Sequence, residues 1–290
     1  MKPPPFDYVR PTSLRDVLAA LGEHGSDAKV LAGGQSLMPM LAFRMAAPRI
    51  LVDIGRLAEL KGITFDADGV SLGALVRWCD IERNERVAAE QPLLAEAIRH
   101  VAHYQIRNRG TVGGSLAHAD PAAEMPAIAL ACDATIFVAG AGGVREIAAH
   151  DFFAGALTTV LKPTELLVGV RLPAWPATRR WAFEEFSRRR GDFALAGVAL
   201  YFDRHGNGAV AAPHIVGFGI ADRPVRLAGA EEAIRGERSD EQSLAAAVRA
   251  ATLGIDVSAD IHAPADYRAA LLGTLLERAL RRAAGLGEAG

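Results

Sequence analysis

The chain has 290 residues, half of them hydrophobic, and carries 32 lysines and arginines against 34 aspartates and glutamates. This length predicts about two domains, and the balanced charge lacks the basic stripe on which nucleic-acid binding depends. Two cysteines without a C-x-x-C pair are too few for a zinc ribbon or an iron–sulfur cluster, and no window approaches the roughly 18 consecutive apolar residues of a membrane span.

The first 55 residues have the pattern of a small α/β lobe. They lack the apolar stretch of a signal peptide, so a cytoplasmic location is expected. Ser13, followed three residues later by Asp16, predicts the start of a helix, and Gly25 predicts its end. The short apolar segments 29–32 and 50–54 are predicted to be strands.

A second lobe with mixed helices and strands is predicted up to about residue 176. Strands are expected at 70–75, 134–138, 144–147 and 165–172, and helices at 78–88, 92–104 and 122–132. The last of these helices is expected to open just after Asp120, which would place Asp120 and Glu124 on one face of its first turn.

Prolines 173 and 176 predict a boundary, because proline interrupts both helix and sheet. After it, three segments have the spacing of antiparallel strands, at 180–187, 193–202 and 210–220. Alanine and leucine then dominate three predicted helices, at 228–235, 240–253 and 265–284.

Two short segments combine paired glycines with hydroxyl residues: Ala32-Gly33-Gly34-Gln35-Ser36 and Thr111-Val112-Gly113-Gly114-Ser115. Adjacent glycines allow positive φ and the close approach of another group, and successive N–H groups in such a turn can bind an anion. Two such sites would hold the two phosphates of a dinucleotide such as FAD. Two ordinary tight turns are the alternative. A bulky residue at Gly34 or Gly114 is expected to block FAD.

The commoner nucleotide motifs are absent. No G-x-x-x-x-G-K-[ST] supports a P-loop, and no G-x-G-x-x-G opens a helix after a strand, as a Rossmann site requires. The anion would therefore be held by backbone N–H groups and by the hydroxyls of Ser36, Thr111 and Ser115. The carboxylates of Asp120 and Glu124 would accept hydrogen bonds from ribose or ribityl hydroxyls, or would form a plain acidic helix start.

No catalytic residue and no metal ligand is assigned. His118 is a candidate for a base or a covalent flavin link, or for a structural hydrogen bond, and the eight histidines show no metal-ligand spacing. The segment Arg190-Gly191-Asp192 forms either a turn or a polar edge that faces a cofactor. No Ser/His/Asp or Cys/His constellation follows from the spacing.

These residues resemble the FAD-binding medium subunit of the molybdenum hydroxylases, the family of aerobic carbon monoxide dehydrogenase and xanthine dehydrogenase. The resemblance runs almost from end to end of the chain. It rests on the opening P-P-F-D-Y, on L-A-G-G-Q-S-L at 31–37, on Q-I-R-N-R-G-T-V-G-G-S-L-A-H-A-D-P at 105–121, and on R-G-D-F-A at 190–194.

The resemblance implies an α+β fold. It implies a two-lobed FAD-binding domain of the vanillyl-alcohol-oxidase-like (PCMH) type at 1–176, with lobes at about 1–55 and 56–176. A C-terminal domain at 177–290 would contain a three-stranded antiparallel sheet and helices.

It also implies the cofactor-binding residues. Segments 32–36 and 111–115 would bind the FAD diphosphate from two sides, Leu161 would pack on the flavin, and Asp192 would lie on the flavin side. The full set is Val30, Leu31, Ala32, Gly33, Gly34, Gln35, Ser36, Leu37, Ile106, Thr111, Val112, Gly113, Gly114, Ser115, Asp120, Glu124, Leu161 and Asp192. Ser115 replaces a commoner asparagine and Ala42 a common lysine, and neither removes a backbone donor.

The implied function is electron relay in an oxidoreductase. A large subunit with a molybdopterin-cytosine dinucleotide or related molybdenum cofactor would oxidise substrate, and a small 2Fe–2S subunit would pass electrons to FAD, which reduces an external acceptor. The complex is expected to be a dimer of heterotrimers, associated with a membrane only through its partners.

The resemblance leaves the substrate open among carbon monoxide, a purine, an N-heterocycle and an aldehyde. It leaves the electron acceptor open as well. A stand-alone FAD-dependent oxidase or reductase is the alternative, and a scaffold without flavin is a third.

Overall fold

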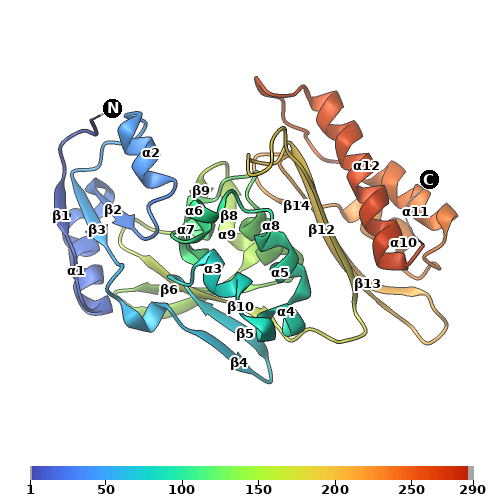
Figure 1. Cartoon of the computed structure of the whole chain (residues 1–290), viewed down its shortest axis with the longest axis horizontal. Coiled ribbons are helices and arrows are strands. Elements are labelled where there is room, and N and C mark those ends of the chain that lie inside the picture. The colour runs from blue at the N-terminus through green and yellow to red at the C-terminus, as the bar shows by residue number, and fades with distance from the viewer. Residues whose placement is uncertain (1, 287–290) are drawn as a thin grey trace.

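The computed structural model describes residues 2–286, which form three parts side by side (Figure 1). The N-terminal lobe contains a parallel sheet in the order β1-β3-β2. Its elements are β1 (Asp7–Val9), α1 (Leu14–His24), the 3-10 turn η1 (Gly25–Asp27), β2 (Ala28–Leu31), α2 (Leu37–Ala42) and β3 (Ile50–Asp53). The predicted helix and both predicted strands are confirmed. Ser13 accepts a hydrogen bond from the Asp16 N–H at 3.1 Å, and Gly25 ends α1 with φ at 51°.

The middle lobe is built on an antiparallel sheet in the order β4-β5-β10-β6-β7. The strands are β4 (Ile63–Asp66), β5 (Gly69–Gly73), β6 (Thr135–Gly140), β7 (Gly143–Ala148) and β10 (Leu166–Pro173). Short pieces complete it: η2 (Ala58–Leu60), α6 (Tyr104–Arg107), α7 (Val112–His118), α9 (Ala149–Phe152), β8 (Phe153–Gly155) and β9 (Thr158–Thr159). The four strands predicted in this region are confirmed, and β4 had no predicted counterpart.

The helix predicted at 78–88 is two helices, α3 (Trp78–Glu82) and α4 (Glu85–Glu90). The break lies at Asn84, whose side chain accepts hydrogen bonds from the N–H groups of Arg86 and Val87 and so begins a new helix. The helix predicted at 92–104 is shorter, because α5 (Pro92–Ile98) ends six residues before that point.

The helix predicted after Asp120 begins later. The Asp120 carboxylate accepts a hydrogen bond from the Ala122 N–H at 2.9 Å, which forms a turn, and α8 (Glu124–Ala131) starts only after it. A hydrogen bond between an aspartate side chain and the nearby backbone competes with helix formation in this way. The expectation that Asp120 and Glu124 share a face of one helical turn is therefore wrong.

The C-terminal sheet has the order β11-β12-β13-β14. The three predicted strands are present as β11 (Arg180–Phe186), β12 (Ala196–Arg204) and β13 (Val210–Phe218), but the sheet is four-stranded, because the two-residue β14 (Val225–Arg226) pairs with β13. The predicted helices are α10 (Ala228–Ile234), α11 (Glu241–Ala250) and α12 (Ala265–Ala284), which lie on the outer side of the sheet (Figure 1).

The C-terminal sheet is covered on both faces. Ala182 belongs to a core shared with α10, α11 and α12, whereas Phe183, its neighbour on β11, belongs to the core of the middle lobe. Successive strand residues point to opposite faces, so Glu185 shares the face of Phe183, towards α5 and α8. The joint between the middle lobe and the C-terminal sheet is therefore part of one hydrophobic core.

Candidate cofactor site

A cavity of about 640 Å³ is lined by segments of the N-terminal lobe, the middle lobe and the loop before β12. This volume lies in the range of small-molecule and cofactor sites, about 300–1,000 Å³. The expected site residues that line it are Val30, Ala32, Gly33, Gly34, Gln35, Ser36, Leu37, Ile106, Thr111, Gly113, Gly114, Ser115, Asp120, Glu124, Leu161 and Asp192. Leu31 and Val112 are not among the lining residues, and Val112 is fully buried in the core.

The first glycine-rich segment connects β2 to α2 and keeps its backbone donors free. Gly34 has φ at +75°, which favours glycine. Within the described chain, no protein acceptor pairs with the N–H groups of residues 33–37. The Gln35 side chain donates to the Gly33 carbonyl at 3.1 Å and holds the turn together. Five successive unpaired donors at a cavity wall are suited to a phosphate or another anion.

The second glycine-rich segment is not a turn, as the sequence had predicted, but the first turn of α7. Thr111 caps this helix and accepts from the Gly114 N–H at 3.1 Å, and the Ser115 N–H donates to the Thr111 carbonyl. The N–H groups of Val112 and Gly113 donate to Val76 and Ala74. All four donors are thus satisfied by the protein, and neither glycine has a positive φ. In this structure the segment therefore offers no free backbone donor among residues 112–115, although Thr111, Gly113, Gly114 and Ser115 line the cavity.

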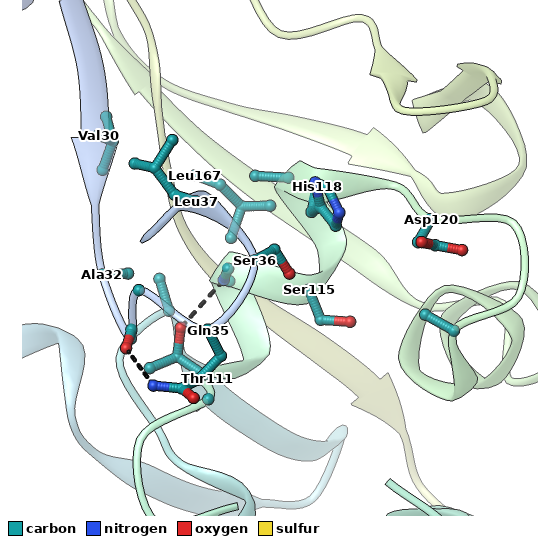
Figure 2. A pocket seen from close by; sticks show the side chains of 18 of the residues that line it. Val30, Ala32, Gln35, Ser36, Leu37, Thr111, Ser115, His118, Asp120 and Leu167 are labelled. Carbon is teal, nitrogen blue, oxygen red and sulfur yellow. Dashed lines mark hydrogen bonds between the residues drawn. The ribbon is translucent and has the colours of Figure 1, made fainter. Parts of the chain in front are cut away.

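The two segments are complementary across the cavity. Figure 2 shows the side chains of Ser36 and Ser115 projecting from their two segments into the same space. The hydroxyls of Ser36 and Ser115 have no protein partner among the described residues. The N-terminal lobe therefore supplies the free N–H groups, and α7 supplies a hydroxyl opposite them.

Gly33 lets the first segment lie directly against residues 109–110, just before the second segment. A Cβ atom at Gly33 would lie 2.1 Å from the Arg109 carbonyl oxygen and 3.0 Å from the Gly110 Cα atom. A Cβ at Gly34 would instead meet the side chains of Met38 and Leu31, within its own segment. At Gly114 it would meet the Thr111 hydroxyl at 2.7 Å. Among these glycines, Gly33 is the one required for the close packing of the first segment on residues 109–110.

The polar end of the cavity contains His118, Asp120 and Glu124 (Figure 2 labels the first two). Burial raises the pKa of Glu124 to about 7, and the charge of Asp120 adds to this effect. Burial lowers the pKa of His118 below its usual range, against the opposite effect of Asp120. A neutral imidazole and an easily protonated carboxyl therefore line this wall at neutral pH.

Part of the apolar wall is formed by residues outside the expected site. Leu157 and Phe193 line the cavity with 49% and 62% of their surface exposed. Leu157 has φ at +53°, and its N–H donates to the Ala119 carbonyl at 3.0 Å, which anchors the 156–158 turn beside α7. His103, Lys162 and Leu167 also line the cavity. Leu157 carries no local pattern, whereas Phe193 and Lys162 directly follow the expected site residues Asp192 and Leu161.

Residues 2–286, the part of the chain that the structure describes, contain neither a metal site nor a membrane-spanning helix. These residues contain no group of three or more His, Cys, Asp or Glu side chains placed to hold a metal ion. Over the same range no helix combines the length and the apolar character that crossing a bilayer requires. Cys79 and Cys132 are buried free thiols.

A second buried carboxyl, Glu185 on β11, interacts with Glu124. Burial, together with the charge of Glu124, raises the pKa of Glu185 to about 9. Its Oε2 atom is buried and has no hydrogen-bond partner. An uncharged carboxyl explains this arrangement, because a buried carboxylate without a partner is costly.

We expect this carboxyl to make the protein less stable as the pH rises. A raised native pKa means that the native state holds a proton that the unfolded state releases, so stability is full below about pH 4 and falls as the pH rises through the native pKa. The free energy of unfolding should decline between pH 6 and 9, by up to about 1.4 kcal/mol per pH unit for one such group. Urea unfolding of wild type and Glu185→Gln at pH 6, 7.5 and 9 tests this. Equal slopes in both proteins would contradict it.

Comparison with known proteins finds relatives over nearly the whole length of the chain. Residues 4–175 match the family described as FAD binding domain in molybdopterin dehydrogenase, and residues 181–283 match the CO dehydrogenase flavoprotein C-terminal domain. The chain is 40% identical to 6-hydroxypseudooxynicotine dehydrogenase complex subunit alpha of Paenarthrobacter nicotinovorans, over 98% of this chain and 96% of that protein. It is 38% identical to the carbon monoxide dehydrogenase medium chain of Hydrogenophaga pseudoflava, over 98% of each.

Solved structures agree with this comparison. The chain superposes on a chain of the carbon monoxide dehydrogenase from Hydrogenophaga pseudoflava that lacks the Mo-pyranopterin moiety, with a TM-score of 0.94, 40% identity and 98% coverage of each chain. It superposes on a chain of quinoline 2-oxidoreductase from Pseudomonas putida 86 with a TM-score of 0.93, 39% identity, and coverage of 98% of this chain and 99% of the other.

Proposed function

The chain belongs to the family of FAD-binding medium subunits of the molybdenum hydroxylases, and from this membership we propose that it relays electrons through an FAD held in the cavity. The electrons would come from a 2Fe–2S cluster of a small partner subunit and go to an external acceptor. A large subunit with a molybdenum cofactor would oxidise the substrate. The chain's own task is to hold the flavin and to set its surroundings.

The observation that carries the proposal is the run of free N–H groups at residues 33–37, opposite the Ser115 hydroxyl. A diphosphate fits this donor set, because it offers only acceptor atoms and needs no protein carboxylate nearby. FAD supplies a ring that accepts and returns electrons. The apolar side chains of Leu157, Leu161 and Phe193 would pack around that ring. Glu124 would accept hydrogen bonds from hydroxyls of the sugar or ribityl chain.

We also propose that the cofactor is bound by residues 1–176, with lobes at about 1–55 and 56–176. Residues 177–290 would form a C-terminal domain that closes the cavity with the Gly191–Phe193 loop. The subunits would assemble as a dimer of heterotrimers. The relatives that support assembly are themselves named as subunits or chains of complexes.

The direct test is purification of the chain alone and purification of the intact complex from the native cells. Retention of a yellow flavin that is released as FAD on denaturation is the expected result for the chain. Co-purification with an iron–sulfur subunit and a molybdenum subunit, and reduction of the flavin only when both are present, is the expected result for the relay. A colourless chain that does not take up added FAD would contradict the proposal.

Removing a single hydroxyl should weaken FAD binding. Ser36→Ala and Ser115→Ala each delete one donor toward a charged phosphate, a contact of about 1.5–3 kcal/mol, so the dissociation constant should rise roughly 10- to 100-fold. Titration of apoprotein with FAD, followed by flavin fluorescence, measures this rise. Ser26→Ala, on an exposed turn of the same lobe, is the matched control and should leave the constant unchanged.

A further inference from the structure

A short irregular segment, residues 160–163, lies between β9 and β10 on the wall of the cavity. Its residues Leu161 and Lys162 line the cavity, and Leu161 packs on the core of the middle lobe. The Leu161 N–H donates to the Thr159 hydroxyl at 3.2 Å, and the Lys162 N–H donates to the Glu165 carboxylate at 2.9 Å. Side chains therefore satisfy these two donors, in place of the backbone carbonyls that a strand or a helix would offer.

Arg145, on β7, joins both ends of this segment. Its Nε atom donates to Glu165 Oε1 at 3.0 Å, and its Nη2 atom donates to Glu165 Oε2 at 2.8 Å. The same Nη2 atom donates to the Val160 carbonyl oxygen at 3.4 Å. Two parallel bonds between a guanidinium and a carboxylate fix geometry as well as charge. Arg145 therefore holds the start of the segment at Val160 directly, and its end through Glu165.

The same pair sets the charge of this part of the wall. The Glu165 side chain is 9% exposed and the Arg145 side chain 42%, and Glu165 is itself a lining residue of the cavity. The hydrogen bonds from Arg145 hold the pKa of Glu165 below its usual range, against the opposite effect of burial. Glu165 is therefore ionised at neutral pH, and without Arg145 its charge would repel an anionic ligand in the cavity.

We propose that Arg145 and Glu165 are positioning residues of the cofactor site, which hold the 160–163 segment so that Leu161 packs on the flavin ring. The inference rests on the proposed function, because Leu161 has this role only with FAD in the cavity. The pair acts through the segment and needs no contact with the flavin. A wall that is fixed before the ligand arrives lowers the entropy cost of binding, so a loosened segment should weaken FAD binding and alter the surroundings of the ring.

The test titrates the full-length apoprotein with FAD. Arg145→Met removes all three hydrogen bonds of the guanidinium, and the dissociation constant should rise about tenfold, as for the loss of an outer-shell support at a metal site. The visible circular dichroism of the bound flavin should change too, because the ring loses a fixed neighbour. Arg145→Lys keeps the charge without the paired geometry and should restore part of the affinity. Arg235→Met, which breaks the exposed ion pair with Glu232 at the end of α10, is the control and should match wild type.

A second measurement does not use the flavin. Amide hydrogen exchange of the apoprotein should become faster over residues 158–166 in Arg145→Met and stay as in wild type in Arg235→Met. Wild-type FAD affinity and an unchanged flavin spectrum in Arg145→Met would overturn the positioning role and leave the proposed function intact. Faster exchange spread over the whole chain would also overturn it, because the pair would then support the fold in general. A wild-type chain that binds no FAD would overturn the proposed function itself.

Discussion

Replacing Gly33 by valine is expected to abolish FAD retention. The added Cβ would lie 2.1 Å from the Arg109 carbonyl oxygen, so the segment with the free N–H groups must move away from the segment before α7. Backbone atoms on both sides leave little room to relax, and overpacking of this kind costs about 1–3 kcal/mol. At the upper end, that strain alone weakens binding by about 100-fold.

The matched control is Gly62→Val, in the loop before β4, where an added Cβ meets nothing within 4 Å. Both variants are purified and their flavin content is compared, and each apoprotein is then titrated with FAD. Gly62→Val should bind as wild type does. Full occupancy in Gly33→Val would show that the contact with residues 109–110 is not needed for binding.

The largest loss of stability is expected from Arg268→Met. This arginine on α12 is 5% exposed and donates to the carbonyl oxygens of Leu195 and Gly219 at 2.7 and 2.5 Å. It also pairs with Asp260 at 2.7 Å. Methionine fills similar space but leaves two buried carbonyl groups without donors, each at about 1–3 kcal/mol. We expect the free energy of unfolding to fall by about 3 kcal/mol or more.

Denaturant unfolding measures this loss, and Arg278→Met provides the control. Arg278 lies on the same helix but is exposed, so its replacement should stay within about 0.5 kcal/mol of wild type. Asp260→Asn should cost less than Arg268→Met, since the carboxylate is half-exposed and the two carbonyl bonds of Arg268 remain. An equal loss in Asp260→Asn and Arg268→Met would assign the effect to the ion pair instead.

Local signals in the sequence predicted local structure well. Ser13 and Gly25 bound α1 as expected, because a cap and a left-handed glycine act within one turn of the chain. The wrong predictions arose where one residue pattern is compatible with two local structures. Paired glycines suggested a turn at 113–114, yet Thr111 caps a helix there and Ala74 packs on Gly113 too closely for a side chain. The negative charge of Asp120 suggested the start of a helix, but its side chain accepts a hydrogen bond from the Ala122 N–H and forms a turn there.

The site was predictable only in part, for a physical reason. The two glycine-rich segments are marked by composition, and the structure brings both to one cavity. Leu157 has no such mark, because it reaches the cavity through the long-range packing of segments that are far apart in sequence, and Phe193 was indicated only by its place beside Asp192. The use of the backbone donors also could not be predicted: whether an N–H is free depends on whether a neighbouring strand or loop offers a carbonyl to it.

The free donors lie on the N-terminal lobe, and most of the remaining cavity wall belongs to the rest of the chain. The N-terminal lobe has a small hydrophobic cluster, joined by Leu57, Leu60, Leu75 and Leu166 from beyond its last strand. A ligand held by both sides adds its binding free energy to whatever keeps the lobes together, since it binds only when they are assembled. Binding of the cofactor would then contribute to the stability of the folded subunit as well as to its chemistry.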